Sequence, residues 1–136
     1  MSKDLIFLAS TTQSVDADDP ITLPIILRRR GCAIESFGAG AILRKAGYYK
    51  VSGTVTLTTP TAGTVILQLQ KSGVDVQGIS ASVTTSGTAA TTDVKTLSFT
   101  GIVRVYCGET NPVITLLNEG VAISVSSASL EAEYYA

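Results

Sequence analysis

The sequence predicts an all-β domain, and three observations carry that prediction. The β-branched residues Thr, Val and Ile are frequent, no window shows the period of an amphipathic helix, and Gly, Asn and Asp recur at intervals of about ten residues. The length of 136 residues suits one domain that can bury a core without a metal or a disulfide. The hydrophobic content of 45% is spread through short segments, which is typical of strands.

The alternation of apolar and polar residues predicts ten strands. It is clearest in AGYYKVSGTVTLTT, residues 46–59, because side chains in a strand point to opposite faces in turn. The residues predicted to face the core are Tyr49, Val51, Val55, Leu57, Val65, Leu67, Leu69, Leu97, Phe99, Val103, Val105, Leu130, Ala132 and Tyr134. The predicted ranges are 21–28, 32–36, 40–44, 47–58, 64–71, 74–79, 94–107, 113–117, 121–126 and 129–135.

Two segments do not fit this pattern. Residues 1–20 show no sheet alternation, so we expect either an N-terminal arm or attachment segment, or a leader that packs along the barrel. Residues 81–93 are rich in Ser, Thr and Ala and predict a long exposed loop or a poorly paired edge segment. Short antiparallel strands protect their edges best as two packed sheets with Greek-key connections, a jelly roll, which we expect over residues 21–136.

The composition argues against catalysis. The chain has no histidine, which excludes Ser–His–Asp and Cys–His nucleophiles, and its eleven acidic residues are scattered, mostly at turns. No glycine-rich phosphate-binding motif occurs. The acidic residues Asp16, Asp18 and Asp19 offer a calcium site as one alternative and a polar turn before Pro20 as the simpler one. We therefore predict no enzyme activity, no catalytic or cofactor-binding residues, no metal and no cofactor.

Charge and cysteine content limit the partners. The net charge of −1 gives no general attraction to nucleic acid, and the cluster Arg28–Arg30 is more typical of a solvated edge or an intersubunit contact. No segment is long enough to insert into a membrane, and the N-terminus lacks the features of a signal peptide. Cys107 continues an inward-facing series, so we expect it to be buried; whether it pairs with Cys32 stays open.

Several stretches resemble a known superfamily. The run AGYYKVSGTVTL followed by AGTVILQLQKSGVDV is similar to the aromatic strand and hairpin of the complement globular-head and tumour necrosis factor-like proteins. The resemblance continues through SFTGIVRVYCGETNPVITLLNEG to a terminal strand with an aromatic pair, and ITLPIILRRRGCAIES resembles the opening strands of bacterial and prophage-encoded members. Ser72 stands where the family often has Asn, and GETNPV replaces a typical G-D-x-V, so vertebrate signalling roles are not carried over.

The resemblance implies a ten-stranded, two-sheet jelly-roll sandwich that assembles as a homotrimer. It also implies that the strands at 47–58 and 94–107 and the terminal strand turn their outer face to the threefold axis. The outward residues combine aromatic rings with charges of both signs, a composition that interface centres favour over a solvated face. The predicted trimer-interface residues are Tyr48, Lys50, Ile102, Arg104, Tyr106, Glu131, Glu133 and Tyr135.

A structural and adhesive role follows as the main functional hypothesis. We expect a trimeric knob on a bacteriophage or prophage particle, as a head fibre, decoration or tail-tip module on the virion surface after cytoplasmic assembly. Its partners would be itself, other virion or surface-fibre proteins and a cell-surface glycan, which loops 81–93 and 108–112 are available to bind. The alternatives are a filament tip on a bacterial spore or cell surface, and a β module that holds a small molecule in its interior.

Overall fold

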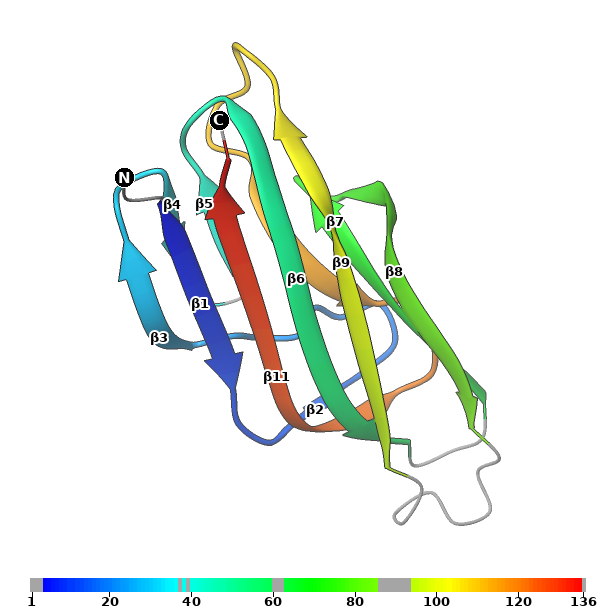
Figure 1. Ribbon diagram of the computed structural model, residues 1–136. Coiled ribbons are helices and arrows are strands. Elements are labelled where there is room, and N and C mark those ends of the chain that lie inside the picture. The colour runs from blue at the N-terminus through cyan, green and yellow to red at the C-terminus, as the bar shows by residue number, and fades with distance from the viewer. Residues whose placement is uncertain (1–3, 37, 39, 60–62, 86–93, 136) are drawn as a thin grey trace.

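The chain folds into a sandwich of two antiparallel sheets, seen in the computed structural model of Figure 1. The structure describes residues 4–36, 38, 40–59, 63–85 and 94–135. These residues form eleven strands and no helix, so none of them lies in a helix that could cross a membrane. The all-β jelly-roll prediction is confirmed.

One sheet has six strands and the other has five. The six-stranded sheet has the order β3-β1-β11-β6-β9, and β2 pairs with β11 beyond the end of β1. Its strands are β1 (Leu5–Ser10), β2 (Gln13–Val15), β3 (Ile25–Arg30), β6 (Gly47–Thr58), β9 (Lys95–Val105) and β11 (Ile123–Tyr134). The five-stranded sheet, in the order β4-β5-β10-β7-β8, contains β4 (Ile34–Ser36), β5 (Gly40–Leu43), β7 (Gly63–Lys71), β8 (Val74–Thr85) and β10 (Val113–Asn118).

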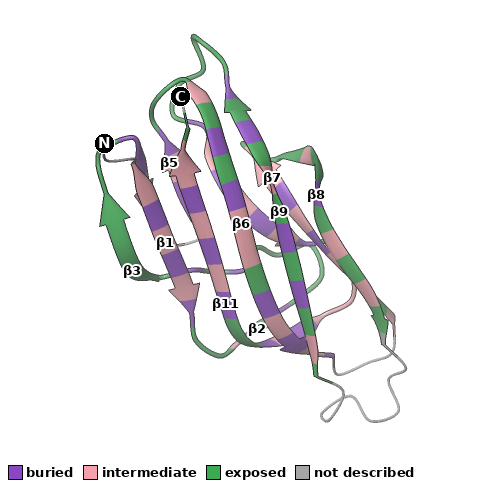
Figure 2. Ribbon diagram, viewed as in Figure 1, coloured by how far each residue is buried: buried purple, intermediate pink, exposed green. Residues whose placement is uncertain are grey.

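The core lies between the two sheets and is filled by the inward half of each alternating strand. Figure 2 shows the alternation of buried and exposed residues along β6, β9 and β11. The residues predicted to face the core are buried except Tyr134, which is partly buried and packs against it, and Cys107, which is exposed. Gly53 interrupts the inward series of β6 because an added Cβ would lie 2.4 Å from Cζ of Phe99, whose ring fills that space.

The N-terminal segment differs from the prediction. Leu5–Ser10 forms β1, which lies between β3 and β11, so the expectation that residues 1–20 lack sheet alternation is wrong for this segment. Ile6 and Leu8 are fully buried, whereas Leu5 and Phe7 face outward and are half-buried. Apolar residues on both faces conceal the period of two from sequence inspection.

Three further details of the prediction need correction. Cys107 is exposed because β9 ends at Val105 and the chain turns away at Gly108, where φ is +96°. Cys32 is also exposed, and both thiols are free.

Strand β8 continues to residue 85, so the first part of the segment 81–93, predicted as a loop or edge segment, is strand. Residues 86–93 lie outside the described residues. The two predicted C-terminal strands are one strand, β11, with an irregularity between Val125 and Ser127.

Asn118 ties the acidic turn at residues 16–19 to the end of β10. Its side chain is fully buried, and Nδ2 donates to the carbonyls of Val15 (3.4 Å), Asp16 (3.3 Å) and Val121 (2.9 Å). Its Oδ1 accepts from the backbone N–H of Gly120 at 3.1 Å. One amide therefore satisfies four backbone groups at the end of the sandwich, which is how a buried polar side chain stabilises irregular backbone.

Replacing this amide should destabilise the whole domain. Asn118→Ala leaves buried carbonyl and N–H groups without partners, and we expect a loss of about 2–3 kcal/mol in the free energy of unfolding. Urea denaturation of the variant and of Gln77→Ala, which removes an exposed amide on β8, measures the effect. Equal midpoints for the two variants would contradict the role given to Asn118.

Candidate subunit interface

The strands that the sequence placed side by side are direct partners in the six-stranded sheet. β6 pairs with β9 along one side and with β11 along the other. The eight residues predicted for the interface all lie on or next to the outer face of this sheet, the face turned away from the core. Tyr48, Lys50, Ile102, Arg104, Tyr106 and Tyr135 are exposed, and Glu131 and Glu133 are half-buried.

The register arranges these side chains in rows across the strands. Tyr48 is opposite Arg104, and Lys50 lies between Ile102 on β9 and Glu133 on β11. Ile102, a large aliphatic residue of β9, is 56% exposed. The outer face thus presents an aliphatic side chain beside charges of both signs.

Arg104 orders the aromatic rings on this face. Its guanidinium carbon lies 4.5 Å from the centroid of the Tyr106 ring and 5.4 Å from that of Tyr48. Such cation–π contacts hold side chains in place before any partner arrives. This three-residue group is called the Arg104 stack below.

The outer face extends over β1 and β3, which sequence reasoning missed. Leu5 is opposite Glu133 on one side and Arg30 on the other, and Phe7 lies in the same way between Glu131 and Arg28. The face therefore has an apolar strip along β1 between an acidic row on β11 and a basic row on β3. The apolar residues on both sides of β1 were the available signal, since a solvated strand face is polar.

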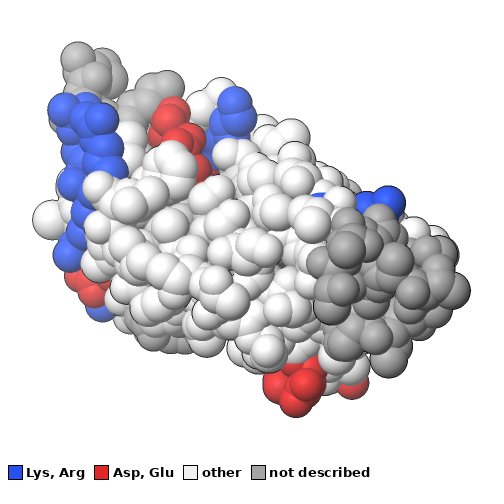
Figure 3. Space-filling model, turned by 90° about the horizontal axis from the view of Figure 1, so that it is seen from below, with Lys and Arg blue, Asp and Glu red and all other residues white. Residues whose placement is uncertain are grey.

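Basic side chains gather at the β3 edge of the molecule, on the left in Figure 3. Arg29 points toward the other sheet, where its Nη2 lies 3.5 Å from Oε1 of Glu35. Arg44 donates to Oε2 of the same carboxylate at 2.6 Å, and this hydrogen bond is the main cause that lowers the pKa of Glu35. Arg28–Arg30 thus lie on the edge strand β3 of the six-stranded sheet. A position at an edge was one of the two interpretations that the sequence suggested.

A second group of charged side chains lies at the opposite edge of the sandwich, between β9 and the end of β7. Lys71 Nζ donates to the carbonyl of Arg104 at 2.8 Å and to Glu109 Oε1 at 3.1 Å, and it lies 5.2 Å from the centroid of the Tyr106 ring. The Tyr106 N–H donates to the same carboxylate oxygen at 2.7 Å. This backbone hydrogen bond, followed by Lys71, lowers the pKa of Glu109. Nothing in the sequence spacing of 71 and 109 pointed to this pair.

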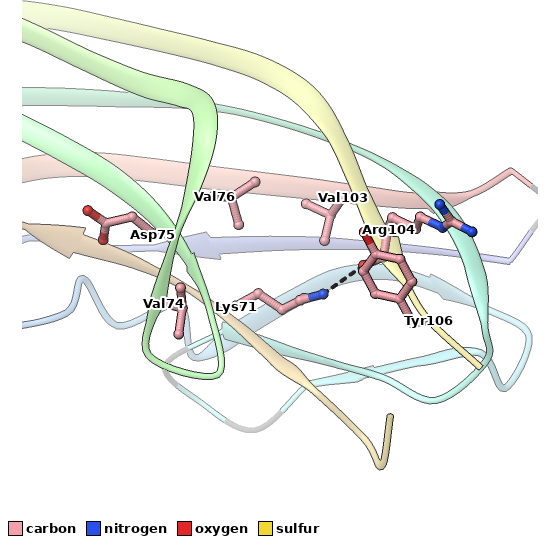
Figure 4. Close-up of a pocket in the computed structure, with 7 residues that line it drawn as sticks. All are labelled: Lys71, Val74, Asp75, Val76, Val103, Arg104 and Tyr106. Atoms are coloured by element: carbon pink, nitrogen blue, oxygen red, sulfur yellow. Dashed lines mark hydrogen bonds between the residues drawn. The ribbon is translucent and has the colours of Figure 1, made fainter. Parts of the chain in front are cut away.

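A hollow of about 220 Å³ lies beside this group, as Figure 4 shows. It is lined by Lys71, Val74, Asp75, Val76, Val103, Arg104 and Tyr106. Its polar groups are largely engaged with one another, since Asp75 accepts from Gln70 at 2.7 Å and Lys71 is shared as described above. Tyr106 therefore stands at the edge of the sandwich, between the outer face and this hollow.

The far end of the outer face carries hydroxyl groups instead of rings. Thr54, Thr56 and Thr58 follow one another on β6, opposite Ser98 and Thr96 on β9. On the other side of β6, Ser129, Ser127 and Ser124 occupy the matching positions of β11.

The described residues contain no group of three His, Cys, Asp or Glu side chains that could hold a metal ion, so the structure lends the calcium alternative no support.

Comparison with solved structures identifies the arrangement of strands. The Eiger TNF from S. frugiperda matches with a TM-score of 0.76 and 11% identity, over 100% of this chain and 94% of that one. The globular domain of the zebrafish complement 1qA protein matches with a TM-score of 0.68 and 10% identity, over 96% and 95%. The fold is the tumour necrosis factor-like jelly roll.

A vertex protein shares this tumour necrosis factor-like jelly roll. The PRD1 vertex protein P5 matches with a TM-score of 0.62 and 17% identity, over 98% of this chain and 97% of that one. No family model and no curated protein sequence matches the chain. The superfamily resemblance inferred from the residues is thus confirmed at the level of the fold.

The ion pair at the β9 edge predicts a pH dependence. Because the folded-state pKa of Glu109 is lowered, its contribution to stability is present above the ordinary pKa of glutamate, about 4.3, and is lost as the pH falls through the folded value. Glu109→Gln should therefore lower the urea midpoint at pH 7, and the difference from the wild type should shrink as the pH falls below about 4.3. A midpoint difference that is as large in acid as at neutral pH would assign the effect to packing instead.

Proposed function

We propose that this chain is a non-enzymatic module that assembles as a homotrimer through the outer face of its six-stranded sheet. The observation that carries the proposal is the combination on that face of the exposed Ile102, the Arg104 stack and the half-buried apolar strip of Leu5 and Phe7. Interface centres are enriched in Tyr and Arg, and a few such residues supply most of the binding free energy.

Charge and rigidity both favour association of like copies. The face carries the acidic row Glu131 and Glu133 between the cations Lys50 and Arg104 on one side and Arg28 and Arg30 on the other. A face with both signs can meet a rotated copy of itself with opposite charges in contact. The rings of the Arg104 stack are already ordered, so that little side-chain entropy is lost on binding. A trimer is also the assembly that the superfamily resemblance implies.

We further propose that the trimer is a structural and adhesive knob on a bacteriophage or prophage particle, as a head fibre, decoration or tail-tip module. The fold likeness to the PRD1 vertex protein supports this role over the other candidates. The absence of histidine from the sequence and the lack of a metal-holding group among the described residues support a role without catalysis. In the turn at 108–112, residues 108–111 are exposed and available for contacts outside the trimer.

A charge placed at the centre of the face tests the trimer. Ile102→Glu brings three like charges together near the axis, and we expect the mass measured by light scattering to fall from three times 14.1 kDa to that of a single chain, or aggregation. Ser82→Glu, which adds the same charge to an exposed position of β8 in the other sheet, should stay trimeric. A wild-type chain that is monomeric at micromolar concentration, or an Ile102→Glu variant that stays trimeric, would rule out this interface.

The location on a particle has its own test. Immunogold labelling of phage particles from the producing strain, with antibodies raised against the purified domain, should mark one defined part of the virion. Labelling confined to spores or to cell-surface filaments would contradict the particle assignment while leaving the trimer intact.

A further inference from the structure

A second hollow lies at the end of the sandwich far from the Arg104 stack. It has a volume of about 460 Å³, within the size range of small-molecule sites. The hollow forms where the start of β11, the end of β6 and β2 meet, at the lower end of the molecule in Figure 1. Its lining consists of Ser14, Asp16, Thr58, Thr59, Ala122, Ile123 and Ser124.

Four polar side chains of this hollow, Ser14, Asp16, Thr58 and Ser124, keep their hydrogen-bonding capacity. Ser14, Ser124 and Thr58 are direct partners across three adjacent strands, so their hydroxyls form one row on a rigid platform. Within the described residues, neither these three hydroxyls nor the carboxylate of Asp16 has a side-chain partner. The first hollow differs in this respect, because Lys71, Glu109 and Asp75 are engaged there with other protein groups.

The backbone beneath the hollow is held firmly. The buried Asn118 side chain donates to the carbonyl of Asp16, which lines the hollow. It also donates to the carbonyl of Val121, which directly precedes the lining residue Ala122. The position of Asp16 is therefore fixed by a buried amide and not by the exposed turn alone. A preformed site of this kind binds with a smaller entropic loss.

We propose that this hollow binds a neutral saccharide. A sugar hydroxyl both donates and accepts, as do the hydroxyls of Ser14, Thr58 and Ser124, and the carboxylate of Asp16 accepts from hydroxyl donors in the strong, charge-assisted way. The half-buried Ala122 supplies apolar surface for the C–H face of a sugar ring.

Other ligand classes fit less well. Among the described residues the lining has one carboxylate and no cation, which disfavours phosphates, sulfates and acidic sugars, and the end of the molecule seen in Figure 3 has a broad central area without charged side chains. A calcium ion requires six to eight oxygen ligands, usually with several carboxylates. We therefore assign neutral saccharides as the ligand class for the proposed adhesive role. The presence of three sites in one particle rests on the proposed trimer, whereas the binding of a saccharide to a single chain does not.

The site and the trimer can be tested separately. Thr58 lies ten residues along β6 from Tyr48, which corresponds to about 33 Å. The full chain is first screened on an array of neutral oligosaccharides, with sialylated and sulfated glycans on the same array. The best neutral glycan is then titrated as a soluble monovalent ligand by calorimetry, which reports affinity for each chain without avidity.

Two matched pairs of variants locate the binding. Asp16→Ala should weaken the affinity at least about tenfold, whereas Asp19→Ala, which removes the same charge from the same turn outside the hollow, should leave it unchanged. Thr58→Val should weaken it by about threefold or more, whereas Thr54→Val, on the same face of β6, should not.

The outcomes separate the two proposals. A trimer that binds no neutral glycan, or that prefers the anionic ones, overturns the saccharide site and leaves the trimer standing. Wild-type affinity in Asp16→Ala overturns it as well. A monomer that binds a neutral glycan through Asp16 keeps the site and overturns only the assembly.

Discussion

The register of β11 is the constraint on which the rest of this structure depends. β11 pairs with β1 and β2 along one edge and with β6 along the other, so it sets which outer side chains meet across the sheet. A slip by one residue would exchange Leu130 and Ala132 in the core for Glu131 and Glu133. The burial of the apolar pair therefore also fixes the acidic row on the outer face, and the charges, rings and hydroxyls of that face lie on a rigid frame.

The two open edges of the sandwich are bridged in the same way, by a carboxylate held between the sheets. Glu35 joins Arg29 and Arg44 at one edge, and Glu109 joins Lys71 and the Tyr106 N–H at the other. Exposed ion pairs contribute little to the free energy of unfolding, so the core and not these bridges holds the sheets together. The Glu109–Lys71 bridge at the β9 edge instead holds the Tyr106 ring beside Arg104. Through Tyr106, this edge is connected to the proposed interface.

The sequence predicted the features that depend on local alternation and missed those that depend on contacts across the fold. The inward residues of β6, β7 and β9 could be identified because polar residues separate them, whereas β1 could not, because Leu5 and Phe7 make its outer face apolar too. All eight interface candidates lie on one face, although the partnership of Lys71 and Glu109 joins segments that no spacing relates. Cys107 shows the limit of extrapolating an alternating series, since the series ended two residues earlier.

The outer face has two chemically different ends, and this difference would let one sheet serve both the proposed assembly and the proposed binding. Rings and aliphatic side chains gather at the end near Tyr48, where burial of a given area yields the most free energy, whereas serine is depleted in interface centres. Association centred on the Arg104 stack therefore leaves the hydroxyl end, about 33 Å away along β6, hydrated. Threefold symmetry would then place three saccharide hollows at the same end of the assembly, facing the same way. Weak sites arranged in that manner can engage one surface together, and their combined affinity exceeds that of each.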